Sequence, residues 1–106
     1  MQILEGKPYK DAMKKYSQFR KQVYNHINDL ENNPEIGELL KAGKFKGMRH
    51  DKINSNFAIF YVYCKEAKNL RNGVKCPWCK EDCSKIDEDT LVLLNFGSHD
   101  ITDNIR

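Results

Sequence analysis

The sequence predicts an α+β fold in which an N-terminal helical hairpin packs on one face of a small, twisted, mostly antiparallel sheet. Two observations lead to this prediction. Apolar residues recur at helical spacing over residues 10–31 and again after Pro34, and from residue 45 onward they follow the pattern of extended strands. Helices that precede a run of strands are typical of α+β domains. Because a chain of 106 residues is long enough for one hydrophobic core, we expect a single domain over residues 1–106.

The first half of the chain predicts a short edge strand at residues 1–5, followed by two helices. The apolar stripe of the first helix consists of Ala12, Tyr16, Phe19, Val23, Ile27 and Leu30. These residues recur at steps of three and four, which is the spacing of one face of a helix. Pro34 ends that helix because proline cannot continue it. Asn33 and Pro34 then predict the N-cap and first position of a shorter second helix, which Gly43 ends.

The second half of the chain predicts three strands. Residues 45–53 form a strand with a polar face, and residues 56–64 are aromatic and β-branched with almost no polar residue, as in a central strand buried on both faces. Residues 90–96 form the last strand, which Gly97 and Ser98 end. A long polar loop separates the last two strands.

The formal net charge of the chain is +3, and the positive charge is concentrated in the first half. Residues 1–53 hold eleven Lys and Arg against seven Asp and Glu, which gives +4, so this half is better suited to contact a polyanion. No apolar run approaches the ~20 residues of a membrane span, and the N-terminus lacks the apolar stretch of a secretory signal. We therefore expect a cytoplasmic protein with no membrane partner.

Every cysteine of the chain lies between residues 64 and 83. Cys76 and Cys79 form a Cys-x-x-Cys turn, and Cys64 and Cys83 complete a possible four-thiolate shell that leaves a metal no open position. Such a shell predicts a structural Zn²⁺ site, with iron as the alternative metal, that orders the insertion at residues 65–89. Disulfides are rare in cytoplasmic proteins, and a redox Cys-x-x-Cys pair usually follows a strand in a thioredoxin-like setting that this chain lacks.

A basic segment at residues 41–52 is the first candidate for substrate binding. Alternate residues of a strand share a face, so Lys44, Lys46, His50 and Lys52 are expected to form a row that suits phosphate oxygens. Arg49 joins this row if Gly47 marks a β-bulge. The alternative is an edge strand whose lysines prevent aggregation.

His99, directly after the last strand, is the second candidate. An imidazole can give or take a proton near neutral pH. Beside a cationic row it supplies what RNA cleavage without a catalytic metal requires: a proton-transfer group, and cations that stabilise the charge on phosphorus. Only RNA has the 2′-hydroxyl that attacks in this reaction.

Two stretches of the sequence, NNPEIGELLKAGKFKGMRHDKINSNFAIFYVY and TLVLLNFGSHD, resemble the RelE/ParE toxin superfamily. The matching features are the Asn-Pro between the helices, the run from Leu40 to Arg49, the aromatic strand and the final Gly-Ser-His. The ending is similar to that of the YafQ-type branch of RelE-like mRNA interferases. The resemblance covers nearly all of the chain outside residues 65–89.

The resemblance implies a toxin of a type II toxin–antitoxin system that cleaves mRNA in the ribosomal A site without a catalytic metal. It implies that His99 is a catalytic acid or base, that Arg49 contributes to catalysis and phosphate binding, and that His50 and Lys52 supply further proton-transfer or phosphate-contacting groups. The implied partners are mRNA, the ribosome and a cognate antitoxin. The chain departs from the family at Ala58, where many relatives have arginine, and in lacking a tyrosine or phenylalanine shortly after the histidine.

Other functions remain open at the level of sequence. One is a non-catalytic RNA- or ribosome-binding module that uses cations and an aromatic residue of the insertion. Those residues are Lys65, Lys68, Arg71, Lys75, Trp78 and Lys80. Another is a toxin that resembles ParE and acts on gyrase, and a third is a domain whose aromatic surface mainly holds an antitoxin-like helix.

Overall fold

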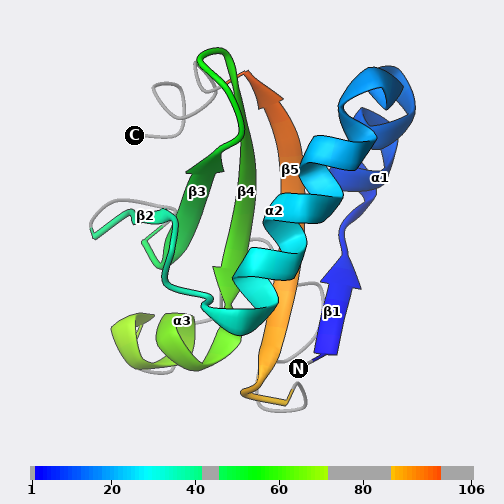
Figure 1. Ribbon diagram of the computed structural model, residues 1–106. Helices are drawn as coiled ribbons and strands as arrows, with labels where there is room; N and C mark the ends of the chain where they lie inside the picture. Colours follow the sequence, from blue (N-terminus) through cyan, green and yellow to red (C-terminus); the bar gives the residue numbers. More distant parts are fainter. Residues whose placement is uncertain (1, 42–45, 72–86, 99–106) are drawn as a thin grey trace.

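The computed structural model describes residues 2–41, 46–71 and 87–98. In these residues the order of elements along the chain is β1, α1, η1, α2, β2, β3, β4, α3 and β5 (Figure 1). The prediction of an α+β fold is confirmed. Among the described residues, no helix is both long enough and apolar enough to cross a membrane.

A five-stranded sheet forms the centre of the molecule, with the strand order β1-β5-β4-β3-β2. The two longest strands, β4 (Phe57–Tyr63) and β5 (Thr90–Ser98), pair in the middle. The strand β3 (Met48–Lys52) lies antiparallel between β4 and the two-residue β2 (Glu38–Leu39). At the other edge β1 (Gln2–Glu5) runs parallel to β5, so the sheet has one parallel pairing among antiparallel ones.

The predicted helix at residues 10–31 is wrong as one continuous element. The structure has α1 (Lys7–Lys15), a single 3₁₀ turn η1 (Ser17–Phe19) and α2 (Arg20–Asn32). The backbone leaves the helical region at Tyr16, with φ −111° and ψ 48°. The break lets α1 and α2 lie on one face of the sheet (Figure 1), whereas the predicted hairpin paired residues 10–31 with a helix after Pro34. The three-to-four spacing of apolar residues continues through the turn, so the sequence pattern did not reveal it.

Aromatic rings pack at this break and hold the helices to the sheet. Tyr16 lies 5.1 Å from Phe57 and 5.8 Å from Phe96, measured between ring centroids. Phe19 lies 4.9 Å from Phe57 and 6.1 Å from Phe96. Tilted and edge-to-face contacts at these distances stabilise beyond simple burial. The turn at residues 16–19 therefore places its two aromatic residues over the ends of the two central strands.

The predicted second helix after Pro34 is also wrong for the described residues. After α2 the chain turns and enters the sheet as β2. The backbone of residues 34–37 bonds to side chains of β3 and β4, and these contacts replace the helical hydrogen bonds that the sequence pattern suggested. The predicted end of this helix falls within residues 42–45, which lie outside the described residues.

The described part of the insertion also differs from the prediction. The central strand ends at Tyr63, and Cys64 begins a helix, α3 (Cys64–Arg71), where a loop was expected. Residues 72–86, which hold the other three cysteines, lie outside the described residues. The strand predicted at residues 45–53 is shorter in the structure, and the last strand extends two residues further than predicted, to Ser98.

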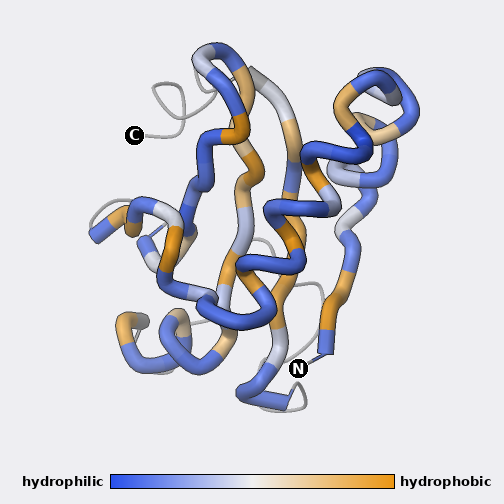
Figure 2. Tube along the Cα trace, viewed as in Figure 1, coloured by the Kyte–Doolittle hydropathy of each residue, from blue (hydrophilic) through white to orange (hydrophobic). Residues whose placement is uncertain are grey.

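Buried side chains fill both faces of the sheet. On one face α1 and α2 contribute Tyr9, Ala12, Met13, Val23, Ile27 and Leu30, which meet Ile59, Tyr61, Leu91, Leu93 and Phe96. On the other face the cluster consists of Leu40, Met48, Ala58, Phe60, Val62 and Ala67. Figure 2 shows the apolar stretches along the central strands and the polar outer sides of the helices. The central strands are thus buried on both sides, as the sequence of β4 predicts.

The hydroxyl of Tyr61 joins the centre of β4 to the segment between α2 and β2. It donates a hydrogen bond to the carbonyl of Pro34 at 2.8 Å and accepts one from the N–H of Gly37 at 2.9 Å. Burial raises the pKa of Tyr61 from 10.0 to about 12. Since the folded-state pKa is the higher one, this tyrosine stabilises the folded protein fully below pH ~10, and that stabilisation is lost as the pH rises towards ~12.

We predict that Tyr61→Phe lowers the free energy of unfolding by about 1–3 kcal/mol, because it leaves a carbonyl and an N–H without their partner. Tyr24→Phe is the matched control, since Tyr24 lies on α2 and is 54% exposed. Chemical denaturation measures both variants. A loss for Tyr61→Phe no larger than that for Tyr24→Phe would contradict the bridging role.

Candidate functional site

The pairing of β3 with β4 sets which of the predicted site residues share a face. Arg49 lies opposite Tyr61 and His50 opposite Phe60, with no shift of register along this described pairing. His50 and Lys52 therefore share one face, as predicted, whereas Arg49 lies on the other, towards α2. Gly47, with φ 98°, sits in the turn before the strand and does not transfer Arg49 across the sheet.

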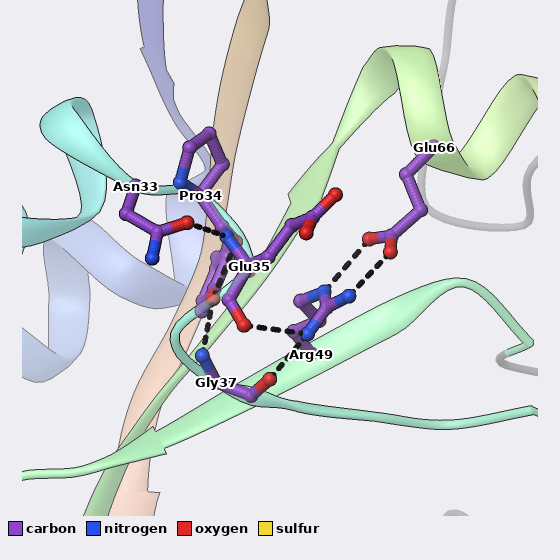
Figure 3. A network of polar contacts seen from close by, with 7 residues as sticks. Asn33, Pro34, Glu35, Gly37, Arg49 and Glu66 are labelled. Carbon is purple, nitrogen blue, oxygen red and sulfur yellow. Dashed lines mark hydrogen bonds and ion pairs between the residues drawn. The ribbon is translucent and has the colours of Figure 1, made fainter.

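Arg49 forms a network with the segment before β2 and with α3 (Figure 3). Its Nε donates to Glu66 Oε2 at 2.8 Å, and its Nη2 donates to Glu66 Oε1. Its Nη1 donates to the carbonyls of Glu35, at 2.9 Å, and Gly37. The hydrogen bond with Glu66 is the main cause that raises the pKa of Arg49, and burial opposes it. Four donated hydrogen bonds leave the guanidinium little capacity for a phosphate unless Glu66 is displaced.

Gly37 is required where the segment before β2 passes over the sheet. A Cβ at this position would lie 2.7 Å from Tyr61 Oη and 2.8 Å from the carbonyl oxygen of His50. Only a residue without a side chain allows this approach. The segment thus lies close against β3 and β4 and leads directly into β2.

His50 lies on the opposite face from Arg49 and is almost fully buried, at 6% exposure. Its ring stacks on Phe60 at 6.2 Å between centroids, and its Nε2 lies 3.3 Å from Glu38 Oε2. Glu38 pairs with His50 across the strands, yet its own side chain is 68% exposed. The sequence interpretation missed Glu38 because it placed this residue on a helix, and only its position opposite His50 in β2 reveals the contact.

A hollow of about 280 Å³ lies beside this pair at the edge of the sheet. It is lined by Ile36, Gly37, Glu38, His50, Asp51 and Lys52. Lys52 is exposed, whereas Asp51 is buried and its Oδ2 lies 2.8 Å from Nδ1 of His26 on α2. The hollow therefore combines an exposed carboxylate, a buried imidazole and an exposed ammonium group.

The strand pairings place the end of β5 close to this hollow. Lys52 pairs with Ala58, and Ala58 pairs with Gly97 on the neighbouring strand. Two strand spacings, or about 10 Å, therefore separate Lys52 from Gly97. His99, the predicted acid or base, follows this strand end in the sequence but lies outside the described residues.

The remaining predicted site residues are described only in part. Lys46 lies in the turn before β3, and Lys44 is outside the described residues. Cys64 is buried at the first position of α3, and Cys76, Cys79 and Cys83 lie outside the described residues. Within the described ranges no three His, Cys, Asp or Glu residues are placed to hold a metal ion. The zinc site remains a prediction.

Among solved structures, the chain is similar to a copper-bound mutant toxin from Helicobacter pylori, with a TM-score of 0.62. The alignment covers 95% of this chain and 97% of that chain at 17% sequence identity. The two proteins therefore share a fold. No protein-family model matches the sequence, and no curated protein matches it.

We predict that the ion pair of Arg49 and Glu66 stabilises the fold. Glu66→Gln should lower the free energy of unfolding by about 1–3 kcal/mol, because it leaves an Arg49 side chain that is only 11% exposed without its anion. A double-mutant cycle with Arg49→Met should give a coupling energy of at least about 1 kcal/mol. Glu31→Gln, an exposed change on α2, is the control. Additive losses in the cycle would show that the two side chains act independently.

Proposed function

We propose that this protein is the toxin of a type II toxin–antitoxin system and inhibits translation by cleaving mRNA on the ribosome. The observation that supports a toxin role best is the likeness in fold to a bacterial toxin, which covers 95% of this chain and 97% of the other. A cognate antitoxin is the partner that such a role requires. The narrower assignment to the RelE-like mRNA interferases rests on the sequence motifs.

The hollow beside β3 supports RNA cleavage in particular. It holds Lys52, which suits a phosphate oxygen, next to the Glu38–His50 pair, which suits proton transfer. The end of β5, at Gly97, lies about 10 Å from Lys52. His99 follows this strand end in the sequence and is the proposed acid or base. Lys44 and Lys46, which precede β3 in the sequence, are proposed to contact the RNA backbone. Arg49 joins them only where phosphate replaces Glu66.

The proposed reaction uses the 2′-hydroxyl of RNA as the nucleophile. A base takes its proton, the 2′-oxygen forms a bond to the adjacent phosphorus, and the bond to the 5′-oxygen breaks. An acid protonates the departing 5′-oxygen. The products are a 2′,3′-cyclic phosphate and a 5′-hydroxyl, and cations stabilise the charge that develops on phosphorus.

A structural Zn²⁺ is proposed for Cys64, Cys76, Cys79 and Cys83. The observation in favour is the buried position of Cys64 at the start of α3, where a thiolate ligand would be shielded from solvent. Bound there, the metal would stabilise the insertion and take no part in the reaction.

We predict that expression of the wild-type protein arrests translation and that His99→Ala relieves the arrest. The reason is that loss of an acid or base costs about 100- to 10,000-fold in rate. Incorporation of labelled amino acid in growing cells measures the effect, and Glu31→Gln, an exposed change on α2, is the control. Equal arrest by wild type and His99→Ala would remove the catalytic role of His99. Arrest without any mRNA cleavage would favour a binding module or an action on gyrase.

We predict one equivalent of zinc per chain in protein purified without added metal, and its loss in Cys79→Ser, because a tetrahedral site requires all four thiolates. Elemental analysis by mass spectrometry measures the content. Ser84→Ala, beside the last cysteine, is the control. A metal-free wild-type protein that is folded and stable in the presence of a strong chelator would contradict the site.

A further inference from the structure

We propose that Glu38 is the general base of the RNA cleavage and that His50 is its positioning residue. This inference rests on the proposed function and assigns a role to a residue that the sequence motifs do not identify. Glu38 and His50 face each other across β2 and β3, with 3.3 Å between Glu38 Oε2 and His50 Nε2.

Exposure decides which member of the pair contacts the substrate. Both ring nitrogens of His50 are buried, and the ring is fixed against Phe60, so RNA cannot reach them in this arrangement. The Glu38 side chain is 68% exposed and lines the hollow beside Lys52. The carboxylate is therefore accessible to a 2′-hydroxyl, and the imidazole Nε2 lies 3.3 Å from Glu38 Oε2 on the buried side.

The other carboxylate of the hollow is less suited to this role. The Asp51 side chain is 12% exposed, and its Oδ2 already lies 2.8 Å from His26 Nδ1. Lys52 lines the same hollow as Glu38 and supplies the positive charge that lets a phosphate approach a carboxylate. The residues that line the hollow thus include one accessible carboxylate and one accessible cation.

The fold fixes the position of Glu38 through the residue before it. The N–H of Gly37 is held by Tyr61 and its carbonyl by Arg49, so the backbone enters β2 in a defined place. A base must lie within about 3 Å of the proton that it removes, and a rigid backbone favours such precision.

In the proposed step the O2′–H bond of RNA breaks and the proton passes to the Glu38 carboxylate. The O2′ electron pair forms the bond to phosphorus, and the bond from phosphorus to O5′ breaks. The departing O5′ takes a proton from the general acid, for which His99 is the candidate. Proton exchange with water then deprotonates Glu38 and reprotonates His99, so atoms and charge balance with no further reactant.

Glu38→Gln tests the assignment, because it keeps the size of the side chain and removes the basic oxygen. In a purified translation system we expect kcat for mRNA cleavage to fall at least about 100-fold, with KM for the ribosome–mRNA complex changed less than about threefold. Binding to complexes that hold a 2′-deoxy codon, which cannot be cleaved, should stay unchanged. Glu38→Asp retains a carboxylate and should retain more activity than Glu38→Gln.

Glu31→Gln is the matched control and should leave kcat unchanged. Thermal unfolding checks that each variant is folded, and the ¹⁵N signals of the His50 ring should move in Glu38→Gln if the pair exists in solution. Full activity of Glu38→Gln would overturn the role of Glu38 and leave the proposed function intact. A KM effect as large as the kcat effect would overturn it in favour of binding. No cleavage by the wild-type protein would overturn the proposed function and this inference together.

Discussion

The segment between α2 and β2 is held against the sheet by two side chains, and the arrangement of the candidate site depends on this constraint. The Tyr61 hydroxyl bonds to Pro34 and Gly37, and the Arg49 guanidinium bonds to the carbonyls of Glu35 and Gly37. The bond to the Glu35 carbonyl is exposed, whereas the other three are partly or fully buried, where each lost partner costs about 1–3 kcal/mol. The same contacts that stabilise the fold therefore determine where β2 begins and place Glu38 opposite His50.

The structure also gives different roles to residues of the basic segment 41–52 that the sequence pattern grouped into one phosphate-binding row. In β3, Arg49 faces α2 and acts within the ion pair with Glu66, whereas His50 and Lys52 face the hollow at the sheet edge. Residues adjacent in sequence thus serve stability on one side of the strand and the proposed chemistry on the other. Glu66 belongs to α3, at the start of the cysteine-rich insertion, so the insertion contributes directly to holding Arg49 in place on the sheet.

The fold class, the three main strands and the face shared by His50 and Lys52 could be predicted from the sequence, because strand alternation and burial leave clear patterns. The break at Tyr16 could not, since its aromatic residues keep a helical spacing while they pack on Phe57 and Phe96. The strand β2 was mistaken for a helix because two residues carry no periodic signal and the contacts that define it come from Arg49 and Tyr61. The contact between Glu38 and His50 can be found only when residues 38–39 are known to form β2.

The most direct test of the proposed cleavage is to map the ends of an mRNA after purified protein acts on it in a reconstituted translation system. We expect cuts within the codon occupied by the ribosome, with 2′,3′-cyclic phosphate and 5′-hydroxyl ends, and no cuts in the same mRNA without ribosomes. Intact mRNA on ribosomes that the protein has stopped would contradict it, as would ends that bear a 5′-phosphate.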